Sequence, residues 1–133
     1  MPALLLKTDE KHVEGVRRNA KHATEACPRE LVEGDLILIQ VTYKASGVSV
    51  CRVRYVMEFV ECYEDKYGES ERIWGRHWHH IIEGRNFHQL RRPFDIDELQ
   101  VSTKNYGRGV IKYAYIRDED MKRIIALGHL EPA

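Results

Sequence analysis

Two apolar runs separated by a Ser-Gly turn constrain the fold of this chain more than any other feature. Residues 36–43 (LILIQVTY) follow a Gly-Asp turn and predict a buried central strand. Residues 48–63 follow Ser46 and Gly47, and they alternate imperfectly between apolar and polar side chains over a length that requires a bend or a bulge. Together the two runs predict a β-hairpin with one irregular arm.

Helices are expected near both ends of the chain. Residues 3–7 (ALLLK) predict a short buried strand, followed by Thr8 and Asp9, either of which can cap a helix over residues 10–22. At the other end, the pattern predicts a strand over residues 109–116 and a short helix over residues 117–128, ended by Gly128.

The middle of the chain is expected to hold loops and short strands. The sequence predicts a loop over residues 64–72, a short strand or strand pair over residues 73–84, and a turn leading into a brief segment over residues 91–99. Strands therefore outnumber helices. This predicts an α+β fold in one domain over residues 1–133, with a strongly curved, barrel-like sheet, mixed or antiparallel, and peripheral helices.

The charge balance and the cysteines limit the class of protein. The 21 basic and 21 acidic side chains cancel, so an anionic partner has to be met by a local patch. Cys27, Cys51 and Cys62 are odd in number, and the opening residues MPALLLKTDE do not predict a secretory leader. We therefore expect three buried thiols in a reducing, cytoplasmic compartment. No apolar run approaches the roughly 20 residues that span a bilayer, so no membrane partner is expected.

Residues 72–93 concentrate the side chains that suit nucleic-acid binding. They hold both tryptophans, Trp74 and Trp78, with four of the seven histidines and five arginines, and Glu83 is their only carboxylate. Flat aromatic faces stack on bases while cations hold phosphates. Core packing is the alternative for either tryptophan, since this is the usual position of the residue. The composition of the segment favours a basic, aromatic-lined binding cleft.

The histidines of the same segment permit a second interpretation. His77, His79, His80 and His88 could bind a metal ion, because neutral imidazole is the commonest metal ligand. However, adjacent His79 and His80 point to opposite faces of a strand, and no cysteine pair completes a tetrahedral site. HExxH, P-loop and GxSxG motifs are also absent. We expect no metal, no cofactor and no catalytic residue. A metal-dependent enzyme using this cluster, and a protein interface anchored by Trp and Arg, remain the alternatives.

Segments along most of the chain resemble, in order, the PUA-like superfamily and its EVE and YTH-like branch. They are LLLKT, RRNAKHAT, EGDLILIQV, the strand GVSVCRVR, the Trp-bearing loop, RPFDIDELQ and YGRGVIKYAYIRDEDMKRIIALG. The resemblance implies a PUA-like fold and a non-catalytic reader of modified bases, of the N6-methyladenine or 5-methylcytosine type, in which the base is flipped into an aromatic pocket. It favours DNA over RNA. It also implies a specificity module for a nuclease or AAA-type motor, as in modification-dependent restriction systems.

The resemblance also implies roles for individual residues. Trp74 or Trp78 would form walls of the base pocket, with Tyr43 and Tyr106 as further walls, and Asn19 would bind the base edge. Burying one methyl group there is worth roughly 1–3 kcal/mol. The residues expected to hold phosphates are Arg72, Arg76, Arg85, Arg91, Arg92 and Arg108. The ASCH branch of the superfamily contains small-molecule hydrolases and is the enzymatic alternative, although its G-x-K-x-x-E-x-R signature is not found.

Overall fold

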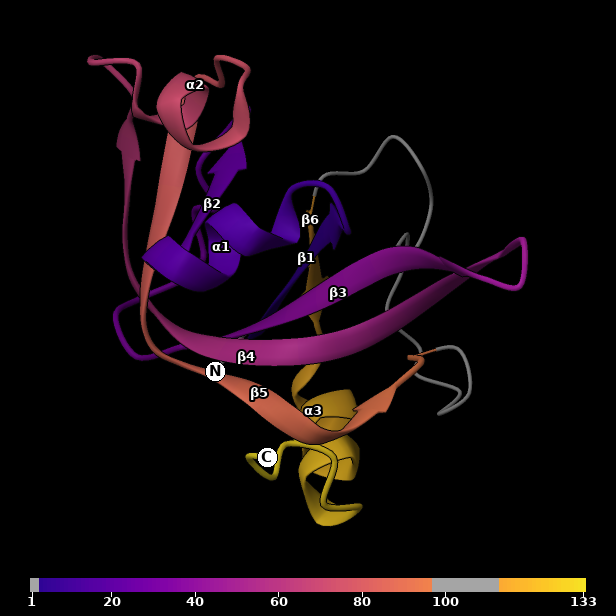
Figure 1. The fold of residues 1–133 in the computed structure, drawn as a ribbon. Coiled ribbons are helices and arrows are strands. Elements are labelled where there is room, and N and C mark those ends of the chain that lie inside the picture. Colours follow the sequence, from indigo (N-terminus) through magenta and orange to yellow (C-terminus); the bar gives the residue numbers. More distant parts are fainter. Residues whose placement is uncertain (1–2, 97–112) are drawn as a thin grey trace.

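A strongly curled sheet with three helices around it forms the described part of the chain, which in this computed structural model comprises residues 3–96 and 113–133 (Figure 1). The elements in chain order are β1 (Ala3–Asp9), α1 (Val13–Asn19), β2 (Lys21–Thr24), β3 (Leu36–Ala45), β4 (Val48–Glu64), α2 (Glu69–Trp74), β5 (His80–Phe94), β6 (Tyr113–Ile116) and α3 (Asp118–Ala126). The expected curved sheet with peripheral helices is confirmed at this level.

The six described strands form one mixed sheet in the order β2-β5-β4-β3-β1-β6. Strands β1 and β3 are parallel, and every other pair is antiparallel. The hairpin between β3 and β4 is confirmed: Ser46 and Gly47 have positive φ angles of 53° and 81°, as a two-residue type I′ turn requires. The register of β4 against β5 shifts three times. Such irregularities bend a strand, which accounts for the curl of the sheet.

The sheet is buried on both faces. In β1, Ala3 and Leu5 belong to one apolar cluster, while Leu4 and Leu6 belong to the other. Helix α3 covers the first cluster through Met121 and Ile124. On the opposite face, α1 contributes Val16 to the second cluster. A strand buried on both sides needs a continuous apolar run, which is why ALLL carries no alternation.

The first helix is shorter than its sequence pattern predicts. Helix α1 ends at Asn19 because Ala20 adopts a left-handed conformation with φ of 52°. Residues 21 and 22, expected to belong to the helix, instead begin β2, which pairs with β5 from Lys21 opposite Glu83 to Thr24 opposite His80. Pairing with a long neighbouring strand outweighs the weak helical preference of these two residues.

The middle of the chain also differs from expectation. Residues 69–74, expected to lie in a loop and a strand, form α2. Strand β5 begins only at His80 and continues through residues 91–94, where a turn was expected. The strand expected over residues 109–116 is described from Tyr113 onward, and Gly128 follows α3 in a left-handed conformation with φ of 75°, as expected. None of the helices in the described ranges is long and apolar enough to cross a membrane.

The expectation of three thiols is wrong for two of the cysteines. Cys27 and Cys62 form a disulfide across 35 residues of sequence. The pair joins the loop after β2 to β4, and both β2 and β4 pair with β5. Sequence spacing carries no sign of that proximity. Cys51 keeps a half-buried thiol, 3.3 Å from the hydroxyl of Thr42.

Candidate nucleic-acid interface

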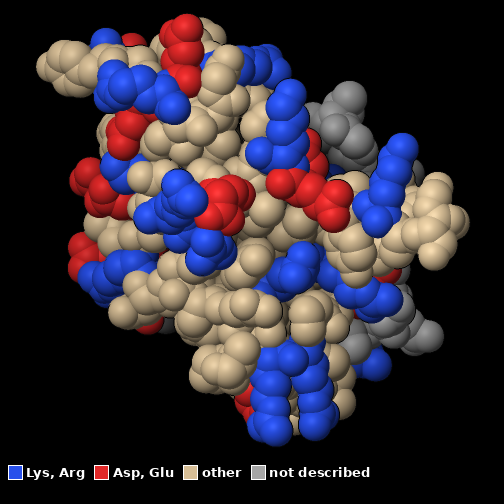
Figure 2. All heavy atoms as spheres, viewed as in Figure 1, with Lys and Arg blue, Asp and Glu red and all other residues tan. Residues whose placement is uncertain are grey.

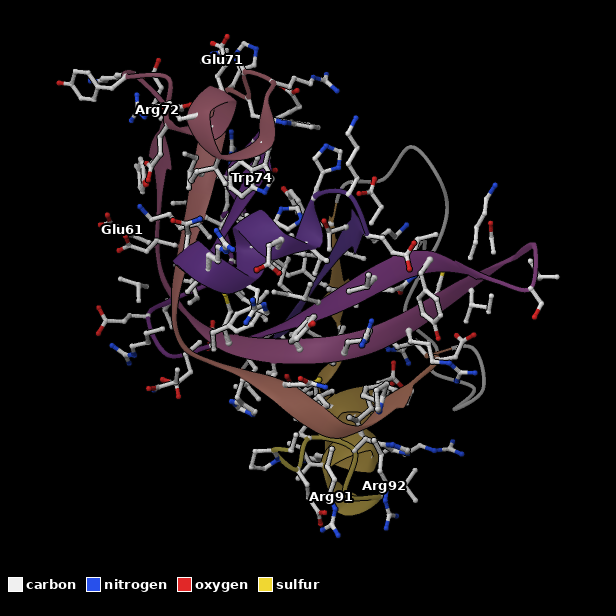
Figure 3. All side chains as sticks on the ribbon, viewed as in Figure 1. Glu61, Glu71, Arg72, Trp74, Arg91 and Arg92 are labelled. Carbon is white, nitrogen blue, oxygen red and sulfur yellow. A yellow bond between two sulfur atoms is a disulfide. The ribbon has the colours of Figure 1, made fainter. Side chains whose placement is uncertain are left out.

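Trp74 is a packing residue that holds α2 against α1. Its indole Nε1 donates a hydrogen bond to the backbone carbonyl of His12 over 3.1 Å. The ring is half-buried against the apolar cluster that contains Val16, and Figure 3 shows it directed from α2 toward α1. Core packing, the alternative for this residue, accounts for these contacts.

Trp78 lies in the turn between α2 and β5 and carries a cation over its ring. The guanidinium carbon of Arg76 is 4.3 Å from the ring centroid, within the range of a cation–π interaction. Arg76 is exposed and Trp78 is half-buried. The backbone N–H of Trp78 donates to the hydroxyl of Ser70 over 2.9 Å, which ties the turn to the start of α2.

Asp65 anchors α2 and the turn that follows it. This buried carboxylate accepts hydrogen bonds from the backbone N–H groups of Glu69 and Ser70, both at 2.9 Å, and from the Ser70 hydroxyl at 2.5 Å. Burial raises the pKa of Asp65, but the three hydrogen bonds outweigh burial and lower the pKa to about 2. The carboxylate is therefore ionised at neutral pH and holds the N-terminal turn of α2 in place.

Glu69 connects the same helix to the sheet. Its carboxylate accepts a hydrogen bond from the hydroxyl of Tyr63 in β4 over 2.6 Å and lies 2.5 Å from the ammonium group of Lys21 in β2. After α2, Gly75 turns the chain with a left-handed φ of 78°. The turn that carries Arg76 and Trp78 is thus held by α2, and α2 is itself fixed to β4 and β2.

The histidines of this region lie beside carboxyl and carbonyl groups. Nδ1 of His77 is 3.8 Å from the carboxylate of Asp65, and Nε2 of His79 is 3.6 Å from that of Glu25. Nδ1 of His80 is 3.0 Å from the backbone carbonyl of Glu25. His88 lies farther along β5. Within residues 3–96 and 113–133, no three His, Cys, Asp or Glu side chains are placed to hold a metal ion.

Two further residues expected in the base pocket lie away from Trp78 or are bonded locally. Tyr43 pairs with Val50 at one end of β4, while Trp78 adjoins α2 beyond the other end (Figure 1). The amide nitrogen of Asn19 donates to the backbone carbonyl of Gly15, one turn earlier in α1, over 2.8 Å. Tyr106 lies outside the described residues. The structure therefore does not bring Tyr43 to either tryptophan.

The arginines expected to hold phosphates divide into separate groups. Arg72 donates to the backbone carbonyl of Tyr67 over 2.7 Å and lies on the same helix as Trp74, whereas Arg91 and Arg92 lie at the opposite end of the molecule, beside α3 (Figure 3). Arg91 is 3.9 Å from the carboxylate of Glu131. On the face drawn in Figure 2, cationic and anionic side chains are interspersed. Arg108 lies outside the described residues.

Arg85 is neutralised by carboxylates from other parts of the chain. It pairs with Glu58 at 3.1 Å and Glu33 at 3.0 Å. Glu58 stands opposite Arg85 in the register of β4 and β5. Residues 72–93 contain one carboxylate, but the fold supplies others, and sequence composition alone does not reveal that strand register.

A group of side chains from α2 and the turns before and after it, here called the Trp78 surface, retains the expected combination of aromatic and cationic side chains. It comprises Lys66, Tyr67, Arg72, Arg76, His77, Trp78 and His79. The backbone N–H of Asp65 donates to the carbonyl of His79 over 2.9 Å, which places the turn before α2 beside the turn after it. Tyr67 is 85% exposed and was missed by sequence reasoning, although its position before Gly68 in a polar stretch marks a turn.

Comparison with known proteins adds no further guide to this surface. No model of a known protein family matches the sequence, and a search of curated proteins finds no significant match.

Proposed function

We propose that this chain is a non-catalytic nucleic-acid-binding domain that contacts its ligand through the Trp78 surface. The observation that carries the proposal is the cation–π pair of Arg76 and Trp78, 4.3 Å from guanidinium carbon to ring centroid, on a patch with further exposed cations. Single-stranded nucleic acids are bound in this way, by aromatic rings that stack on bases and cations that follow the backbone.

Each group of the Trp78 surface has a task in this proposal. The guanidinium of Arg76, positioned by the indole ring, would stack on a base or contact its phosphate, and Lys66 and Arg72 would contact neighbouring phosphates. Tyr67 would offer a second stacking face. Base stacking on one aromatic side chain contributes about 1–3 kcal/mol. Exposed Glu64 and Glu71 adjoin these cations in sequence, so the attraction for phosphate is local and modest.

The sequence resemblance further suggests which ligand the surface would bind. The chain would belong to the PUA-like superfamily, in its EVE and YTH-like branch, and would read a modified base of the N6-methyladenine or 5-methylcytosine type. Trp78 is then the better candidate for the pocket wall, because Trp74 is used in packing α2 on α1. DNA is favoured over RNA, and a nuclease or AAA-type motor in the cytoplasm would carry out the reaction.

The test is a fluorescence-polarisation titration with short oligonucleotides, single- and double-stranded, that are unmodified or carry N6-methyladenine or 5-methylcytosine. Native protein is compared with Trp78→Ala, and with Tyr43→Ala as the matched control because Tyr43 lies at the far end of β4. We expect Trp78→Ala to weaken binding by about 5- to 100-fold, in line with the loss of one stacked base, and Tyr43→Ala to leave it unchanged.

Two results would contradict the proposal. Negligible binding to every probe would exclude nucleic acid as the ligand. Binding that does not weaken as salt is raised would show that phosphates are not contacted, because phosphate contacts make affinity fall steeply with ionic strength. A preference for one modified probe that disappears in Trp78→Ala would identify the base, and equal affinity for all probes would restrict the function to general nucleic-acid binding.

A further inference from the structure

The loop after β2 brings a carboxylate and a disulfide to the edge of the Trp78 surface. Glu25 directly follows Thr24, the last residue of β2, and its carboxylate is 3.6 Å from Nε2 of His79. The backbone carbonyl of Glu25 is 3.0 Å from Nδ1 of His80. One residue thus holds two neighbouring histidines, one of them part of the proposed binding surface.

Strand pairing and the disulfide hold the chain on the two sides of Glu25. On the N-terminal side, Thr24 pairs with His80 in the sheet. On the C-terminal side, Cys27 is bonded to Cys62, whose own partner in β5 is Ile82. Both of these attachments lead to the same stretch of β5, residues 80–82. Strand β2 has only four residues, and besides the disulfide Glu25 is held by the hydroxyl of Thr24, which donates to the carbonyl of Ala26 over 3.0 Å, so the disulfide is the covalent part of this anchoring.

We propose that the Cys27–Cys62 disulfide is a redox-controlled latch on the Trp78 surface, closed when oxidised and open when reduced. The inference rests on the proposed function for its effect on binding, but not for the structural change. Reduction releases the loop, moves the Glu25 carboxylate away from His79, and leaves the surface less negative. Affinity for a polyanion therefore rises.

The chemistry requires a dithiol reductant. Its thiolate attacks one sulfur of the disulfide, the S–S bond breaks, and the other cysteine leaves as a thiolate. The second thiol of the reductant then displaces the first cysteine from the mixed disulfide. Two electrons pass to the protein, the reductant becomes a disulfide, and its two protons end on Cys27 and Cys62. Both cysteines are partly exposed, as attack requires. Disulfides in reducing compartments are usually of this transient, redox-sensing kind.

The structural half of the inference is tested by NMR of the imidazole ring protons in the full chain, with and without dithiothreitol. We expect the His79 and His80 resonances to shift on reduction, and the same shifts in an untreated Cys27→Ser/Cys62→Ser protein. Cys51→Ser is the control and should respond to reductant as native protein does, because Cys51 takes no part in the disulfide. Unchanged His79 and His80 resonances on reduction would overturn the latch whether or not the protein binds nucleic acid.

The functional half is tested by binding of a fluorescent single-stranded oligonucleotide to oxidised and reduced protein. Reduction should raise the affinity about two- to fivefold, the range expected when one exposed carboxylate moves away from a bound polyanion. Glu25→Gln should give oxidised protein the affinity of reduced protein, whereas Glu33→Gln, which removes a carboxylate of the same loop that pairs with Arg85, should keep the redox response. Equal, measurable affinity in both redox states would overturn the latch and leave the proposed function standing. Absent binding in both states would overturn the proposed function and the redox effect on binding.

Discussion

Gly15 of α1 and Trp74 of α2 are packed so closely that the glycine position has no room for a side chain. A β-carbon on Gly15 would lie 2.6 Å from Nε1 of Trp74 and 2.7 Å from Cγ2 of Ile73. The indole cannot easily retreat, because its Nε1 is also bonded to the carbonyl of His12. The contact joins two helices that are 50 residues or more apart in sequence, and it sets how closely α2 packs on α1.

Gly15→Ala should therefore lower the free energy of unfolding by about 1–3 kcal/mol through overpacking. Alanine gains up to about 1 kcal/mol of helix propensity over glycine, which reduces the effect without reversing it. Urea denaturation measures the change. Arg18→Ala, at an exposed position of the same helix, is the control and should stay within about 0.5 kcal/mol of native protein. An equally stable Gly15→Ala protein would show that α1 and α2 are not packed this way.

Asp65→Asn should destabilise the protein by about 2 kcal/mol at pH 7. The native carboxylate has a pKa of about 2, against an ordinary value of 3.8, because its hydrogen bonds outweigh its burial. A lowered pKa contributes stability that is fully present above pH 4 and is lost as the pH falls toward 2. The difference between the two proteins should thus shrink over that interval in pH-dependent denaturation curves. A constant difference from pH 5 to pH 2 would contradict the assignment.

His22 should make the protein less stable in mild acid. Burial lowers the pKa of its imidazole, and the backbone carbonyls of Lys7 and Ala23, 2.9 and 2.7 Å from its ring nitrogens, oppose this only in part. The unfolded chain therefore takes up a proton more readily than the folded chain, so stability falls as the pH drops through about 6.5.

The free energy of unfolding, measured at pH 7.5 and pH 5.5, tests this prediction. Native protein should lose stability over the interval, and His22→Gln should lose less because it has no proton to take up at this position. The opposite sign, with native protein more stable at pH 5.5, would show that a doubly protonated ring donates to both carbonyls and that this outweighs burial.

The disulfide should contribute substantially to stability. Chain entropy alone predicts a loss of about 3–4 kcal/mol for Cys27→Ser/Cys62→Ser, because the bond closes a loop across 35 residues of sequence. Thermal and urea denaturation under non-reducing conditions measure this loss. Cys51→Ser removes a cysteine outside the bond and should cost much less. A double variant as stable as native protein would place the stabilisation elsewhere.

The parts of the fold that follow from local pattern were predictable. The hairpin turn at Ser46–Gly47, the bend of β4 and the C-terminal helix each depend on residues close in sequence. Strand β2 was not predictable in this way. Its first two residues, Lys21 and His22, continue a helical pattern, and pairing with β5, some 60 residues later, makes all four residues a strand. Helix α2 was not predicted, because its start depends on one buried carboxylate, Asp65, and not on a periodic pattern of apolar residues.

The candidate site was predictable in composition but not in arrangement. Residues 72–93 do supply Arg76 and Trp78 to one surface. Trp74 instead packs against α1, where it contacts Gly15, 59 residues earlier in the sequence. No local sequence pattern predicts that contact. Likewise, the carboxylates that neutralise Arg85 come from β4 and from the loop before β3. Long-range partners therefore determine which of the expected residues belong to the Trp78 surface.

The position of β1 in the sheet has a consequence for how the protein is made. This first strand pairs on one side with β3, in parallel, and on the other side with β6, whose residues are synthesised more than a hundred positions later. During translation, one edge of the strongly apolar strand β1 therefore stays unpaired until residue 116 has left the ribosome. An unpaired apolar strand edge of this kind is prone to aggregation. Slow or interrupted synthesis should therefore be the stage at which this chain most needs a chaperone.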